Sequence, residues 1–143
     1  MVALAGGPHG RPWIVDRRGH VQRTDVGAQD LRRGSHDVEL HAVAGVENPV
    51  SLVAGGGHAC ARLSNGTAAC WGSNHRGQVG DGSTAERHEA RYLGLTNVEE
   101  IAAGEAHTCA RASGQVLCWG RNDNGQVSAD RSNGIHEPSV VPW

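Results

Sequence analysis

The chain has 143 residues, of which 21 are glycine, four are tryptophan, one is tyrosine and none is phenylalanine, and its formal net charge is -2. This length suggests one domain, but so few large side chains suit short strands joined by glycine turns better than a globule with one large core. The near-neutral charge without a basic stripe argues against nucleic acid or an anionic membrane as partner, and apolar runs of about five residues exclude a transmembrane helix.

Residues 1–49 hold the first candidate strands. Short apolar or alternating runs at residues 2–4, 13–15, 20–23 and 38–43 predict four strands, with Arg18-Gly19 as the turn of the central hairpin. The pattern is weak, so we interpret this segment as a degenerate copy of a unit that recurs more clearly downstream. Terminal repeats are often atypical, because one of their faces has no neighbouring repeat.

Residues 50–97 and 98–143 are the clear copies. Strands are expected at 50–53, 58–63, 67–71 and 90–93 in the second copy, and at 98–102, 107–112, 115–119 and 138–141 in the third. Ser113-Gly114 forms one hairpin turn, and Pro138 is expected at the start of the last strand, where its missing N–H does little harm. No segment has a helical period, so helix should be close to absent.

The copies are related by a period of 49 residues. Ala54-Gly55 recurs as Ala103-Gly104, and a fainter counterpart, Ala5-Gly6, lies the same distance upstream. Four short strands within such a period are the content of a propeller blade. We therefore predict an all-β chain, a single β-propeller-type repeat domain over residues 1–143, with about three blades of four short antiparallel strands.

The four cysteines fall in register across the two clear hairpins. A two-residue turn at Ser113-Gly114 places Cys109 opposite Cys118, and a three-residue loop at 64–66 places Cys60 opposite Cys70. Such pairs have Cα atoms about 4.5 Å apart, which a disulfide can span. Two cross-strand disulfides are therefore predicted. Buried free thiols remain an alternative, as does a zinc site made of all four thiols, although close Cys-x-x-Cys spacing is missing.

Disulfides favour an exported or oxidising compartment. The first residues, 1–7, are too short and uncharged for a secretory signal, so no signal peptide is recognised and the localisation stays open.

Two longer motifs in the clear copies resemble the regulator of chromosome condensation repeat family. The second copy runs from Ala54-Gly55 through His58 to Trp71-Gly72-Ser73-Asn74 and Gly77-Gln78-Val79-Gly80, and the third repeats this pattern up to Gln126-Val127. The Cys-Trp-Gly sequences also resemble exported bacterial members. The resemblance implies a propeller, which this family usually closes with about seven blades. Ser128 replaces the last motif glycine, which puts the shape of that loop in doubt.

Residues that recur at equivalent positions are interpreted as structural, because a catalytic group is normally unique. The histidines are expected to pack and hydrogen-bond, the tryptophans to fill the space between blades, and the amides to tie loop backbone groups. This set comprises His58, Trp71, Gly72, Asn74, Gln78, His107, Trp119, Gly120, Asn122 and Gln126.

Polar residues of the long loops that do not recur are the better candidates for binding, with solvated loop charges as the plain alternative. They are His75, Arg76, Asp81, Arg87, His88, Arg121, Asp123 and Asp130, to which Glu86 and Arg131 are close neighbours. His36, His41 and His88 could approach one another, but their spacing does not indicate a metal site. No catalytic residue and no cofactor are assigned.

The function predicted from these features is a non-enzymatic protein-interaction module that uses the loop face of a propeller. Two alternatives stay open: small-molecule binding or catalysis by loop His, Asp or Glu groups, and a piece of a longer or engineered propeller. The partner is expected to be a protein of unknown identity.

A homo-oligomer is also expected, most simply a two-fold dimer that closes a six-bladed ring. In the route we envisage, the last strand of one chain completes the first blade of the other, because unpaired blade edges are costly.

Overall fold

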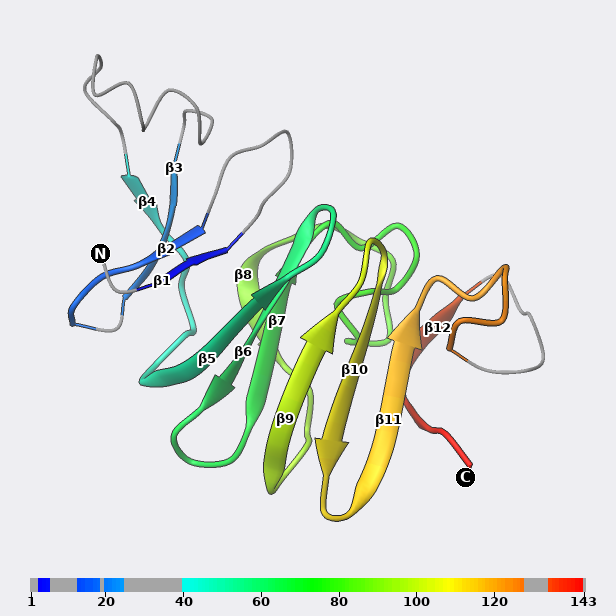
Figure 1. Cartoon of the computed structure of the whole chain (residues 1–143). Helices are drawn as coiled ribbons and strands as arrows, with labels where there is room; N and C mark the ends of the chain where they lie inside the picture. Colours follow the sequence, from blue (N-terminus) through cyan, green and yellow to red (C-terminus); the bar gives the residue numbers. More distant parts are fainter. Residues whose placement is uncertain (1–2, 6–12, 19, 25–39, 128–133, 143) are drawn as a thin grey trace.

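The computed structural model describes residues 3–5, 13–18, 20–24, 40–127 and 134–142, and in this part of the chain every regular element is a strand. Twelve strands form three antiparallel sheets of four, and within each sheet neighbours in sequence are neighbours in space (Figure 1). No helix long and apolar enough to cross a membrane occurs among these residues. The prediction of three four-stranded blades is confirmed.

Blade 1 comprises β1 (Ala3–Ala5), β2 (Trp13–Val15), β3 (Val21–Thr24) and β4 (Leu40–Ala42). Each strand pairs with the next, so this blade holds its own four strands. The envisaged dimer route, in which the last strand of a second chain completes this blade, is therefore wrong. The predicted turn residue Gly19 lies outside the described residues.

Blade 2 comprises β5 (Pro49–Ala54), β6 (His58–Leu63), β7 (Ala68–Gly72) and β8 (Arg87–Tyr92). Blade 3 comprises β9 (Val98–Ala103), β10 (His107–Ala112), β11 (Gln115–Gly120) and β12 (Ile135–Val140). The first three strands of both blades lie within about two residues of their predicted limits.

The outer strands begin three residues earlier than predicted, and Pro138 lies inside β12 instead of at its start. The pairing of β11 with β12 shifts register between Cys118 and Gly120, and β7 with β8 shifts in the same way between Cys70 and Gly72. A bulge on an outer strand tolerates a proline, because no ladder hydrogen bond is required there.

The blades follow one another side by side along the chain, and β5 contacts both β1 and β9 (Figure 1). Two apolar cores lie between them. Trp13, Val21 and Trp71 are central to the core between blades 1 and 2. Val79, Ile101 and Trp119 are central to the core between blades 2 and 3. Each blade is therefore stabilised mainly by burial against its neighbour, and the ring is not closed by the three blades of this chain.

Both predicted disulfides are present. Cys60 pairs directly with Cys70, and Cys109 with Cys118, and each pair has a Cα–Cα distance of 4.1 Å. The register depends on the turns: Gly66 has a φ of 83°, whereas Ser113 and Gly114 both have positive φ, 51° and 76°, as a two-residue type I′ turn requires. No free cysteine is found, so the thiol and zinc alternatives do not hold.

Candidate functional site

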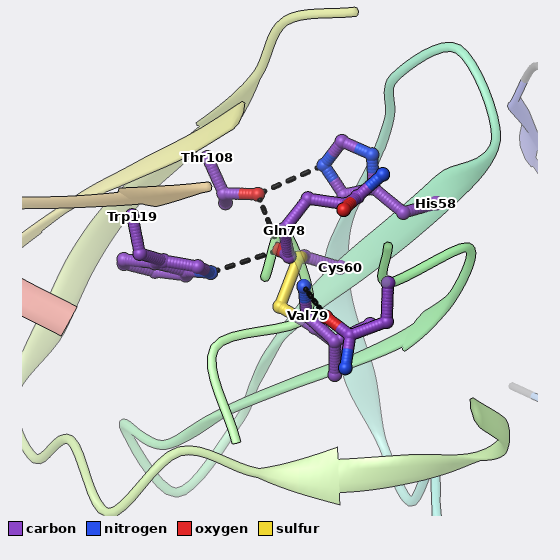
Figure 2. The surroundings of a disulfide bond; sticks show 8 residues. His58, Cys60, Gln78, Val79, Thr108 and Trp119 are labelled. Carbon is purple, nitrogen blue, oxygen red and sulfur yellow. Dashed lines mark hydrogen bonds between the residues drawn. A yellow bond between two sulfur atoms is a disulfide. The ribbon is translucent and has the colours of Figure 1, made fainter. Parts of the chain in front are cut away.

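A hydrogen-bonded joint connects blades 2 and 3 beside the Cys60–Cys70 disulfide (Figure 2). His58 Nε2 lies 2.8 Å from Thr108 Oγ1, and Thr108 Oγ1 donates to the Gln78 carbonyl at 3.0 Å. The indole Nε1 of Trp119 donates to the same carbonyl at 2.9 Å. Two residues of blade 3 therefore donate hydrogen bonds to one carbonyl of blade 2, and all four residues of the joint are buried.

Burial keeps His58 neutral, and the joint selects its tautomer. Burial, and secondarily the nearby His107, lower the pKa of His58 from 6.5 to about 4, so the imidazole is neutral at neutral pH. Because the Thr108 hydroxyl gives its proton to the Gln78 carbonyl, it must accept one from His58 Nε2. His58 is then the Nε2–H tautomer, and in the described part of the chain its Nδ1 is a buried acceptor without a partner.

The loops after β7 and β11 are held by the same side-chain amides. Asn74 Oδ1 accepts from Val79 N–H at 3.0 Å, and Asn122 Oδ1 accepts from Val127 N–H at 2.9 Å. The side chains of Gln78 and Gln126 each accept from the backbone N–H two residues earlier. Because these bonds repeat, they hold residues 74–79 and residues 122–127 in the same local shape and leave the non-repeated side chains there to vary.

Gly80 lets the first of these loops approach the next blade. Its φ is 84°, and a Cβ there would come within 2.6 Å of the Trp119 indole nitrogen. Any larger residue would push the loop away from Trp119. Ser128, which replaces the corresponding glycine of the third copy, lies outside the described residues, as does the candidate Asp130.

Asp81 and Arg87, two of the candidate binding residues, are bound to each other. Arg87 Nε donates to Asp81 Oδ2 at 2.6 Å, and Asn74 donates to the other carboxylate oxygen at 3.2 Å. Burial alone would raise the pKa of Asp81, but hydrogen bonds from Ser83 and Arg87 outweigh it and the pKa is lowered. This pair therefore closes the β7–β8 loop on itself.

His75, Arg76 and Arg121, three further candidates, come together in one cleft of about 410 Å³ between blades 2 and 3. The residues that line the cleft belong to the β5–β6, β7–β8, β9–β10 and β11–β12 connections. These connections leave blades 2 and 3 at the same end, which we name the loop face (Figure 1). Its other lining residues are Gly56, Gly57, Ser73, Gln78, Glu105 and Ala106.

The two arginines of this cleft differ in their pairing. Arg121 Nε donates to Asp123 at 2.8 Å, and this bond is the main cause of the lowered pKa of the Asp123 carboxyl. The positive charge of Arg76 lowers the same pKa further from a distance. Among the described residues Arg76 has no ion pair of its own, so its guanidinium is the cation that remains open to a ligand.

His88 lies in a different and smaller cleft, of about 150 Å³, between blades 1 and 2, with His41, Arg23 and Glu86. Of the three histidines that could approach one another, His36 lies outside the described residues. Within the part of the chain that is described, no group of three or more His, Cys, Asp or Glu side chains could hold a metal ion.

Trp71 packs edge-on against Trp13, with ring centroids 6.2 Å apart, but it differs from Trp119 in one respect. Its buried indole Nε1 has no hydrogen-bond partner among the described residues. The acceptor that Trp119 finds belongs to a Gly-Gln-Val loop, which has no clear counterpart in the first copy.

Sequence reasoning missed Thr108 and Glu105. Thr108 occupies the position that Ala59 has in the second copy. This change from a methyl group to a hydroxyl between the copies could have marked Thr108 as a hydrogen-bonding residue. Glu105, at the position of Gly56, faces the cleft and lies against Gly56 itself. Both residues act across the blade boundary, which a comparison within one copy does not reveal.

Two family models match this chain, and both describe the same repeat. The model of the regulator of chromosome condensation (RCC1) repeat matches residues 50–78 and 98–126, and a second RCC1 repeat model matches residues 65–111. Together these matches extend from residue 50 to residue 126, more than half of the chain. A search of curated proteins gives no match.

Two solved structures show the same fold. Prp20p from Saccharomyces cerevisiae, described with its binding properties to Gsp1p and histones, is 20% identical and has a TM-score of 0.72 over 98% of this chain and 38% of its own. Human WBSCR16 is also 20% identical, with a TM-score of 0.72 over 99% of this chain and 39% of its own. The chain thus spans about two-fifths of the length of these proteins.

Proposed function

Because the chain belongs to the regulator of chromosome condensation repeat family, we propose that it is a non-enzymatic protein-interaction module that binds its partner through the loop face. Prp20p, which shares the fold, is itself described with protein partners, Gsp1p and histones. Neither partner is carried over to this chain, because an identity of 20% supports the fold alone.

The observation that supports this role best is the cleft with the open charge of Arg76. The non-repeated residues His75, Arg76 and Arg121 line it together, whereas the repeated residues serve the joints and loops. An arginine that lines a cleft between two blades and has no ion pair among the described residues is suited to a carboxylate of a partner protein, because paired guanidinium–carboxylate bonds are strong and directional.

Small-molecule catalysis has less support from the geometry. The loop carboxylates Asp81 and Asp123 are each bonded to an arginine, and both have a lowered pKa. A carboxylate of this kind is a poor proton donor or acceptor near neutral pH, since general catalysis needs a pKa near the working pH.

That two copies of the chain form a dimer, and that the chain is a piece of a longer propeller, remain predictions. Light scattering at micromolar concentration measures the mass of the chain and decides whether two copies associate.

The experiment that tests the proposal is affinity capture from an extract of the source organism, followed by measurement of Kd with the captured protein. Arg76→Ala is expected to lose about 1–3 kcal/mol of binding free energy. This is the cost of losing a hydrogen bond between charged groups and leaving the partner's carboxylate buried without its arginine. Arg91→Ala is the matched control, because Arg91 is an exposed arginine on the outer strand β8, away from the cleft. Equal Kd values for the two variants contradict the proposed site.

A further inference from the structure

The turn between β6 and β7 carries a tripeptide that neither the fold nor the loop face requires. In Asn65-Gly66-Thr67 an asparagine is followed two residues later by a threonine, and the residue between them is not proline. None of the other asparagines of the chain has a serine or threonine two residues later. A tripeptide of this kind is the acceptor sequence for N-linked sugars, which are attached to asparagines at the protein surface.

The turn presents Asn65 to solvent on an anchored backbone. Asn65 is exposed. On one side of it, Ser64 N–H donates to the Asn48 carbonyl at 3.0 Å, and on the other side the Gly66 carbonyl accepts from Val98 N–H at 2.8 Å. These bonds involve the backbone alone. A large group on the Asn65 side chain therefore extends into solvent and leaves the anchoring bonds in place.

Thr67 is bonded to only one end of the Asn65 amide. Asn65 Oδ1 accepts from the Thr67 N–H at 3.1 Å and from the Thr67 hydroxyl at 2.6 Å, which closes an Asx turn. In the described part of the chain, the amide nitrogen Nδ2 of Asn65 makes no hydrogen bond. An N-linked sugar is attached to Nδ2 and leaves Oδ1 unchanged. The glycosylated side chain therefore keeps both of its bonds to Thr67.

The disulfides supply a second, independent observation. Cys60–Cys70 closes the hairpin whose turn carries Asn65, and Cys109–Cys118 closes the equivalent hairpin of blade 3. Disulfides persist in exported proteins and in the oxidising compartments through which these proteins pass. N-linked sugars are transferred to proteins in the same compartments. The chemistry of the cysteines and the acceptor tripeptide therefore point to the same environment.

We propose that Asn65 is an N-glycosylation site. The donor is an oligosaccharide carried on a polyprenyl pyrophosphate, and the transferring enzyme belongs to the exporting cell. Nδ2 of Asn65 forms a bond to the anomeric carbon of the sugar and loses one proton. The bond between that carbon and the pyrophosphate oxygen breaks, and the polyprenyl pyrophosphate leaves with the electron pair.

The proposed site is separate from the loop face. The β6–β7 turn lies at the opposite end of blade 2, so a glycan on Asn65 leaves the cleft with Arg76 uncovered (Figure 1). The inference therefore does not rest on the binding role proposed for the loop face.

The test is expression of the whole chain behind a cleavable signal peptide in animal cells that glycosylate exported proteins. Chain from the medium and from the cell extract is digested, and peptide mass spectrometry locates any sugar. Peptide-N-glycosidase in heavy-oxygen water converts glycosylated Asn65 to a labelled aspartate. A parallel digest without this enzyme measures spontaneous deamidation of Asn65-Gly66. We expect sugar on Asn65 and on no other asparagine.

Four variants separate glycosylation from the structural role of the turn. Asn65→Asp keeps an oxygen that accepts from Thr67 but has no amide nitrogen, and Thr67→Ala keeps the asparagine but removes the hydroxyl, so both should lose all of the sugar. Thr67→Ser keeps a hydroxyl and should retain sugar. Asn97→Asp is the matched control, because Asn97 is exposed but lies outside the tripeptide, and it should be glycosylated as the wild type is.

The proposal is overturned if the chain has formed both disulfides and carries no sugar on Asn65. It is also overturned if sugar persists in Asn65→Asp or Thr67→Ala, since the sugar then lies elsewhere or does not depend on the tripeptide. Equal conversion of Asn65 to aspartate with and without the glycosidase is deamidation and counts against the proposal.

Discussion

Replacing Thr108 with Val tests whether the joint between blades 2 and 3 stabilises the fold. Valine keeps the shape and removes the hydroxyl, so His58 Nε2–H loses its acceptor, whereas the Gln78 carbonyl keeps the Trp119 indole as donor. One buried polar group is then left without a partner. The free energy of unfolding should fall by about 1–3 kcal/mol, the cost of such a group.

Urea unfolding followed by tryptophan fluorescence measures this change, and Thr96→Val is the control, because Thr96 is exposed. The control should stay within about 0.5 kcal/mol of the wild type, as expected for a surface substitution. If Thr108→Val is as stable as Thr96→Val, then His58 is satisfied in another way and the proposed tautomer is wrong.

Three other outcomes are expected. The pKa of His58 is about 4 in the folded protein against 6.5 for an ordinary histidine, so the unfolded chain binds a proton first as the pH falls. The free energy of unfolding that is present above pH 6.5 should therefore fall by about 3 kcal/mol as the pH drops to 4. Urea unfolding across this range should show that decrease in the wild type and not in His58→Gln. Trp119→Ala should cost about 3–5 kcal/mol, as for other buried aromatic residues, and a melting temperature within a degree of the wild type would place Trp119 at the surface. Mass spectrometry of non-reduced peptides should show Cys60 joined to Cys70 and Cys109 to Cys118, and four alkylatable thiols or crossed pairs would contradict the register.

The inner part of each blade could be predicted from sequence because its signals are local. Turn residues with positive φ, such as Gly66 and Gly114, fix hairpin length, and hairpin length fixes which cysteines face each other. The 49-residue period then supplies the architecture without any knowledge of packing. The outer strands were less predictable, because β8 and β12 follow long loops and join their sheets through bulges that no local pattern marks.

The candidate site was predictable only as a set of loop residues. Sequence position does not reveal that Asp81 is neutralised by Arg87, or that Arg121 is held by Asp123 while Arg76 is not. These differences arise from how each loop folds back and from contacts across the blade boundary. Thr108 illustrates the same limit, since its partners His58 and Gln78 belong to the preceding blade.

The hydrogen-exchange footprint of the chain bound to its captured partner tests the interaction role most directly. Binding through the loop face predicts slowed exchange at residues 73–78 and 121–126, which border the cleft between blades 2 and 3. The hairpin turns at 64–66 and 113–114, at the opposite ends of the same strands, should exchange as in the free protein. Protection confined to those hairpins, with none at the loops that carry Arg76 and Arg121, would contradict the account.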